Sequence, residues 1–214
     1  LSFTTNTGLP RTMAITSTRT GEGKSVTCYA LANLLARTGR RVLLIDANMR
    51  APALHALFEQ ENVEGFSNLL AGDDDWQEML RPCGQSGLSL LTAGPTPPSP
   101  AQLLSGRRLG TMIEAFAELF DHVLVDCPPV NAGSEAALIA STVQGVVYLI
   151  EAGGPPLRQI RLSQIRLASG GANVLGVVLT KSMPKPDDNP YRPRGNTASY
   201  PALGKPTNGL LGRG

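Results

Sequence analysis

The sequence predicts an α/β fold with a mostly parallel central sheet and helices on both faces. Short apolar runs of strand length alternate with stretches that have the helical spacing of apolar residues, which is typical of parallel sheets covered on both sides. Two of the apolar runs, at 41–46 and 122–126, end in an aspartate. The run at 12–16 leads into a glycine-rich turn. The runs lie at residues 12–16, 41–46, 88–92, 122–126, 146–150 and 174–180.

Length and composition agree with one folded domain, because 214 residues can bury a large core. No apolar run is long enough to span a bilayer. The three cysteines, Cys28, Cys83 and Cys127, are widely spaced, which predicts neither a disulfide framework nor a zinc site and favours the reducing cytosol. The chain opens at Leu1 without a signal peptide, and we expect it to be a piece of a longer protein.

Charge is unevenly distributed along the chain. Residues 181–214 hold six of the 19 Lys and Arg but only two of the 17 Asp and Glu, together with many prolines and glycines. We therefore expect a folded nucleotide-binding domain over residues 1–181 and a flexible basic tail over residues 182–214. The proline-rich stretch at 93–100 is expected to be an ordered loop of the domain.

Residues 17–25 read STRTGEGKS and lie between the first strand and a helix expected at 25–36. The ending Gly-Lys-Ser is that of a phosphate-binding loop (P-loop), although Thr18 stands where the strict motif has glycine. Gly21 and Gly23 let successive backbone amides point inward around a polyphosphate. Lys24 is placed to reach the β- and γ-phosphates, and the Ser25 hydroxyl to bind Mg²⁺. The predicted nucleotide-binding residues are Thr20, Gly21, Glu22, Gly23, Lys24, Ser25 and Val26.

Two aspartates directly follow apolar strands, Asp46 in LLIDANMR and Asp126 in VLVDCPP. The carboxyl ends of parallel strands are where ligands bind in such sheets. A carboxylate there, beside a phosphate loop, is placed to hold Mg²⁺ or its water shell. The alternative is that each aspartate only caps the next helix.

The three motifs resemble those of the bacterial tyrosine kinases of capsule and exopolysaccharide assembly. That family carries S-x-x-P-G-E-G-K-S, then three apolar residues with D-x-D-x-R, then three apolar residues with D-x-P-P. In this chain they stand in the same order as STRTGEGKS, LLIDANMR and VLVDCPP, and PSPAQLLSGRR (98–108) is similar to the family's N-P-S-E-L-L-S segment. The resemblance covers residues 3–181.

The resemblance implies a P-loop NTPase fold and an ATP- and Mg²⁺-dependent protein tyrosine autokinase that regulates polysaccharide polymerisation and export. It implies a catalytic set of Lys24, Asp46, Arg50 and Asp126. The implied metal-binding set is Ser25, Asp46, Asn48 and Asp126, where Asn48 replaces the family's second aspartate. Within these sets, Asp46 is the candidate base for the incoming tyrosine hydroxyl, and Tyr191 and Tyr200 of the tail are the candidate phosphoacceptors.

The resemblance also implies partners and a location. It implies a homo-oligomer that binds no nucleic acid and works with a transmembrane activator, fused upstream or separate, on the cytoplasmic face of the cell membrane. Two alternatives stay open. Asn48 and the sparse tail tyrosines favour an ATP/ADP-binding regulatory module with little phosphotransfer. Arg19, where partition-type ATPases carry a signature lysine, favours a switch of that class, whereas the D-x-P-P and PSPAQLL segments speak against it.

Overall fold

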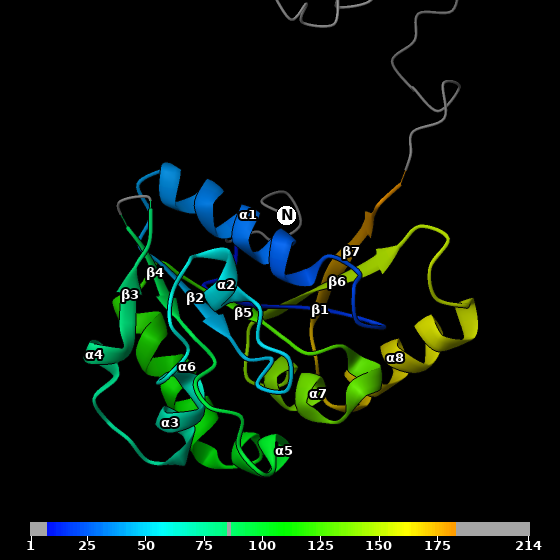
Figure 1. The fold of residues 1–214 in the computed structure, drawn as a ribbon. Coiled ribbons are helices and arrows are strands. Elements are labelled where there is room, and N and C mark those ends of the chain that lie inside the picture. The colour runs from blue at the N-terminus through cyan, green and yellow to red at the C-terminus, as the bar shows by residue number, and fades with distance from the viewer. Residues whose placement is uncertain (1–7, 85–86, 183–214) are drawn as a thin grey trace, which may run out of the picture. The chain divides into compact units, whose positions relative to one another are not determined.

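The computed structural model describes residues 8–84 and 87–182, which form a sheet with helices on both faces (Figure 1). The strands lie in the order β3-β4-β2-β5-β1-β6-β7, and every neighbouring pair is parallel except β3 against β4. The strands are β1 (Thr12–Ser17), β2 (Val42–Asp46), β3 (Leu80–Pro82), β4 (Leu88–Leu91), β5 (His122–Asp126), β6 (Gly145–Glu151) and β7 (Val174–Thr180).

The helices of the described residues fill the connections between strands. They are α1 (Lys24–Arg37), α2 (Leu54–Leu57), α3 (Phe66–Ala71), α4 (Trp76–Met79), α5 (Pro100–Leu104), α6 (Arg107–Leu119), α7 (Glu135–Ala140) and α8 (Leu157–Ser169), with a 3-10 turn η1 (Val130–Ala132). None of these helices is long and apolar enough to cross a membrane. The α/β fold and the mostly parallel sheet predicted from the sequence are confirmed.

The core lies on both faces of the sheet because successive residues of a strand point to opposite sides. In β2, Leu43 and Ile45 pack with the helices α3 and α5–α8, while Val42 and Leu44 pack with α1 and α2. The strands are buried on both sides, which explains their nearly continuous apolar sequences. Figure 1 shows α1 and α2 on one side of the sheet and α3, α5, α6 and α7 on the other.

Two parts of the fold bear on the expectations from sequence. Strand β3 was not anticipated, because it has only three residues and begins directly after α4. The stretch at 93–99 is a loop, as expected, and α5 then begins at Pro100, a residue favoured in the first turn of a helix. The tail prediction and the candidate acceptors Tyr191 and Tyr200 lie outside the described residues, apart from Ser182 at its start.

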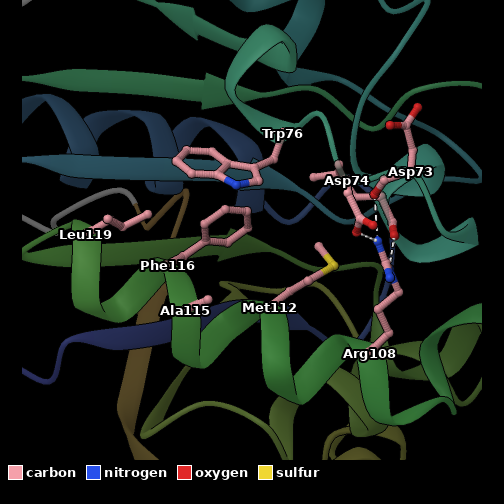
Figure 2. Close-up of a pocket in the computed structure, with 9 residues that line it drawn as sticks. Asp73, Asp74, Trp76, Arg108, Met112, Ala115, Phe116 and Leu119 are labelled. Atoms are coloured by element: carbon pink, nitrogen blue, oxygen red, sulfur yellow. Dashed lines mark hydrogen bonds and ion pairs between the residues drawn. The ribbon is translucent and has the colours of Figure 1, made fainter.

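An apolar pocket lies between α6 and the segment that carries α4 (Figure 2). The ring of Trp76 meets that of Phe116 edge to face, with 5.8 Å between their centroids. Arg108 closes one end of the pocket by binding the Asp74 carboxylate and the carbonyl oxygens of Leu69 and Asp73. None of the residues predicted for nucleotide or metal binding lines this pocket.

Candidate functional site

The glycine-rich turn connects β1 to α1 at the carboxyl edge of the sheet (Figure 1). Gly21 and Gly23 have φ angles of 85° and 90°, which L side chains rarely adopt. The backbone amides of residues 20–26 donate to no other atom of the described part of the chain. A row of amide donors without protein acceptors, at the N-terminus of a 14-residue helix, is an arrangement that binds phosphate.

Lys24 is the first residue of α1, and its side chain is buried beside the loop. Its ammonium group donates to the Ser17 hydroxyl over 3.2 Å. Burial lowers the pKa of Lys24 from its ordinary value, and the nearby carboxylates of Asp126 and Glu22 oppose that shift. The lysine therefore adds a positive charge, little screened by water, to the amide donors of the loop.

Asp46 and Asp126 are partners in the β2–β5 register and lie side by side at the edge of the sheet. Both Asp46 oxygens accept backbone hydrogen bonds: Oδ1 from Asn48 at 3.1 Å, and Oδ2 from Ala53 and Leu54 at 2.9 Å each. Burial raises the pKa of Asp46, and these three amides act against the rise. Asp46 thus caps the start of α2, which was the alternative role predicted for it from the sequence. It also lies next to Asp126.

Asp126 is in a different situation, because it is buried and neither of its carboxylate oxygens has a hydrogen-bond partner among the described residues. Burial raises its pKa to about 7. The Ser25 hydroxyl lowers the pKa although it does not reach hydrogen-bond geometry, the Asp46 charge raises it, and the Lys24 charge lowers it. An unpaired buried carboxylate is costly for a fold unless a cation or a donor compensates it.

These residues fit a bound Mg²⁺-nucleotide. The orphaned oxygens of Asp126, the adjacent Ser25 hydroxyl and the neighbouring Asp46 carboxylate are the hard oxygen donors that Mg²⁺ prefers. The amides of the loop and the Lys24 ammonium supply the complementary donors for phosphate oxygens. The structure therefore brings together Lys24, Ser25, Asp46 and Asp126.

Asn48 and Arg50 have partners of their own, although Asn48 Oδ1, the atom that could bind Mg²⁺, accepts no hydrogen bond from the described residues. The side-chain nitrogen of Asn48 donates to the Ala51 carbonyl over 2.8 Å and so holds the turn after β2. The Arg50 guanidinium binds Glu135 Oε1 through Nε at 2.8 Å and Nη2 at 2.7 Å. Arg50, predicted as catalytic, is thus bound to the start of α7 through a carboxylate that is only 3% exposed. Glu135 carries no distinctive signal in the sequence.

Several residues support the loop in structural roles that were not predicted from the sequence. The Thr18 hydroxyl forms a hydrogen bond with the buried Tyr148 hydroxyl at 2.6 Å. Thr18, which stands where the motif has glycine, therefore has a structural role. Glu22, predicted only as part of the nucleotide-binding set, is 1% exposed and accepts the Arg19 amide at 2.7 Å. The Thr180 hydroxyl donates to the Glu22 carbonyl at 2.9 Å. The sequence signal that could have indicated a role for Thr180 was its position at the end of a predicted strand.

Comparison with known proteins places the chain in a family. Residues 13–189 match the model described as CbiA, the CobQ/CobB/MinD/ParA nucleotide binding domain. A solved structure of the septum site-determining protein MinD from Pyrococcus horikoshii, complexed with Mg-ADP, is similar with a TM-score of 0.65 and 21% identity, over 80% of this chain and 70% of that one. This likeness shows the fold.

Closer relatives are named tyrosine-protein kinases. The putative tyrosine-protein kinase CapB of Staphylococcus aureus is 31% identical over 181 residues, which is 85% of this chain and 79% of CapB. The tyrosine-protein kinase etk of Escherichia coli is 32% identical over 167 residues, which is 78% of this chain but 23% of that longer protein. The solved kinase domain of etk superposes with a TM-score of 0.76 at 30% identity, covering 82% of this chain and 71% of that domain. The chain belongs to the bacterial tyrosine kinases of the CobQ/CobB/MinD/ParA nucleotide-binding family.

Proposed function

We propose that the protein is an ATP- and Mg²⁺-dependent tyrosine autokinase of polysaccharide assembly. In the reaction, the oxygen of a tyrosine hydroxyl bonds to the γ-phosphorus of ATP, the bond to the β,γ-bridging oxygen breaks, ADP leaves and the hydroxyl proton is released. The observation that carries the proposal is the orphaned carboxylate of Asp126, buried beside Lys24 and Ser25 at a loop of free amides. Such transfers depend on positioning and on electrostatic stabilisation more than on covalent chemistry by the protein.

The proposal gives each residue a role that its surroundings support. Lys24 and the amides of residues 20–26 would bind the phosphates, and Ser25 and Asp126 would hold Mg²⁺, whose charge would supply electrostatic stabilisation to the phosphoryl group. Asp46 keeps an acceptor position free on Oδ1, because among the described residues that oxygen accepts a hydrogen bond only from the Asn48 amide. Its raised pKa suits a base that accepts the tyrosine proton.

The context of the kinase is proposed as well. The match to only 23% of the E. coli relative supports a module that works next to other protein segments. We therefore assign this chain a transmembrane partner, fused or separate, homo-oligomeric assembly and a place at the inner face of the cell membrane. The weakly transferring regulatory module and the partition-type ATPase have less support, because CapB and etk, at 31% and 32% identity, are named kinases.

Intact-mass spectrometry after incubation with Mg-ATP tests the proposal. The wild-type chain is expected to gain steps of about 80 Da, one per phosphoryl group. Lys24→Met removes the charge beside the loop and should abolish both the mass steps and Mg-ATP binding measured by calorimetry. Arg37→Met is the matched control, since Arg37 is an exposed cation at the far end of the same helix. Tight Mg-ATP binding by the wild type without any mass gain would support the regulatory module instead.

A further inference from the structure

The phosphate loop is attached to the ends of β6 and β7, outside its own strand–loop–helix unit. The Thr180 hydroxyl, at the last residue of β7, donates to the Glu22 carbonyl in the loop at 2.9 Å. The Glu22 carboxylate binds the Arg19 amide at 2.7 Å and the Glu151 amide, at the end of β6, at 3.4 Å. Thr180 is itself fixed, because it pairs with Glu151 in the β6–β7 register.

The direction of the Glu22 carbonyl determines where the next amide points. A trans peptide group is planar, so its C=O and the following N–H point in opposite directions. No described peptide bond is cis. The Glu22 carbonyl points to the Thr180 hydroxyl, and the Gly23 N–H therefore points away from β7. Like the other amides of residues 20–26, it donates to no described protein atom.

Gly23 by itself would not hold this orientation. It has a φ of 90°, and glycine moves among backbone conformations more freely than any other residue. A Cβ added to Gly23 would meet Thr180 Cγ2 at 3.8 Å, an ordinary van der Waals distance, so the side chain of Thr180 faces the position that a side chain at residue 23 would occupy. The hydrogen bond from the Thr180 hydroxyl thus restrains, from outside the loop, a peptide that glycine leaves free to rotate.

We infer that Thr180 is a positioning residue for the phosphate loop, whose hydroxyl orients the Glu22–Gly23 peptide so that the Gly23 amide is available to a phosphate. This inference rests on the proposed nucleotide binding. It assigns a role to the last strand of the sheet, 158 residues away from Glu22 along the chain. A pre-oriented amide binds an anion more tightly because its orientation costs no further entropy on binding.

Calorimetric titration of Mg-ADP into the full chain tests the inference. Thr180→Val keeps the shape of the side chain and suits a strand, but it removes the donor; we expect the dissociation constant to rise roughly five- to tenfold, the usual effect of one lost hydrogen bond. Thr180→Ser keeps the hydroxyl and should stay within about twofold of the wild type. In ¹⁵N–¹H spectra without ligand, the Gly23 signal should shift in Thr180→Val and return in Thr180→Ser.

Thr142→Val is the matched control, because it removes a threonine hydroxyl that donates to the Ile139 carbonyl at 2.8 Å, away from the loop. It should change thermal stability without changing Mg-ADP affinity. The inference is overturned if Thr180→Val binds as the wild type does while Lys24→Met does not bind, or if the serine variant loses as much affinity as the valine variant. Unchanged affinity in Lys24→Met would overturn the nucleotide site itself, and the inference with it.

Discussion

At the scale of single residues, Asp126 is the most informative group of the site. It is 1% exposed, its oxygens have no hydrogen-bond partner among the described residues, and burial raises its pKa to about 7. The fold thus keeps a carboxylate where it destabilises the protein when ionised. A buried carboxylate that lowers the stability of the free protein is typical of a binding site, because a bound cation offsets the cost of burying its charge.

This arrangement predicts a pH dependence with a definite sign. The unfolded chain has Asp126 at its ordinary pKa of 3.8 and the folded chain at about 7, so between these values the folded state holds a proton that the unfolded state has lost. The contribution of Asp126 to the free energy of unfolding is therefore present below pH 4 and is lost as the pH rises to 7. Asp126→Asn should remove this dependence and, at pH 8, be more stable than the wild type by about 2–4 kcal/mol.

Urea unfolding from pH 4 to pH 8 measures the effect, with the exposed Glu114→Gln as a control for loss of one carboxylate. Added Mg-ATP should reverse the order by raising the unfolding midpoint of the wild type and of Glu114→Gln but not that of Asp126→Asn. An asparagine variant that is less stable at pH 8, or that keeps the wild-type pH dependence, would show that Asp126 is compensated in the folded protein.

At the scale of elements, the ion pair between Arg50 and Glu135 attaches the turn after β2 to α7. The Arg50 guanidinium is half exposed, whereas the Glu135 carboxylate is 3% exposed and binds it through two nitrogens at 2.7 and 2.8 Å. Removing only the arginine leaves a buried charge without its partner, at the helix N-terminus where the dipole favours it. The pair therefore connects the Asp46 turn to the opposite face of the sheet.

A double-mutant cycle tests this connection. Arg50→Met should lower the free energy of unfolding by about 1–3 kcal/mol, and Arg50→Met with Glu135→Gln should cost less than the sum of the single changes. The Arg41–Asp121 pair, at 3.5 Å and with side chains 63% and 31% exposed, is the comparison and should show a smaller coupling. Equal coupling in the two cycles would contradict a special role for the buried carboxylate.

At the scale of the whole molecule, the proposed reaction requires an acceptor tyrosine to reach an active site. Tyr191 follows the last strand by about ten residues, which span at most roughly 35 Å when extended. Because β7 ends at Thr180, in contact with the phosphate loop, this span reaches the chain's own site as well as a neighbour's, and Tyr200, farther along the chain, is less restricted. The buried Tyr148, bonded to Thr18, is not available as an acceptor in the folded protein.

In the proposed homo-oligomer the tail of one chain lies near the site of another, so we expect phosphorylation between molecules, with Tyr200 modified faster than Tyr191. A Lys24→Met chain mixed with the wild type should acquire phosphotyrosine, at a rate that rises with the total protein concentration. Peptide mapping of the mixture, with isotope-labelled Lys24→Met protein, distinguishes the two chains. A double Tyr191→Phe and Tyr200→Phe variant of the inactive chain is the control and should remain unmodified. An inactive chain that never gains phosphate beside an active one would show that transfer is not intermolecular.

The sequence by itself determined the local parts of this protein. The runs that became β1, β2 and β4–β7 are visible from their composition, and the glycine turn followed by Lys24 and Ser25 is visible from its motif. Asp46 and Asp126 could be predicted at strand ends. These features depend on backbone conformation and periodicity within a few residues, which neighbouring side chains specify.

Only the tertiary structure decided which distant groups meet. The strand order brings Asp46 into register with Asp126, and the three-residue β3 exists because β4 is there to pair with it. Arg50 meets Glu135 85 residues away, and Thr180 meets Glu22 158 residues away. Such contacts arise from the packing of the whole sheet, so no local pattern encodes them. These long-range contacts bind Arg50 to α7 and attach the phosphate loop to the last strand. The same packing buries the Asp126 carboxylate without a hydrogen-bond partner among the described residues.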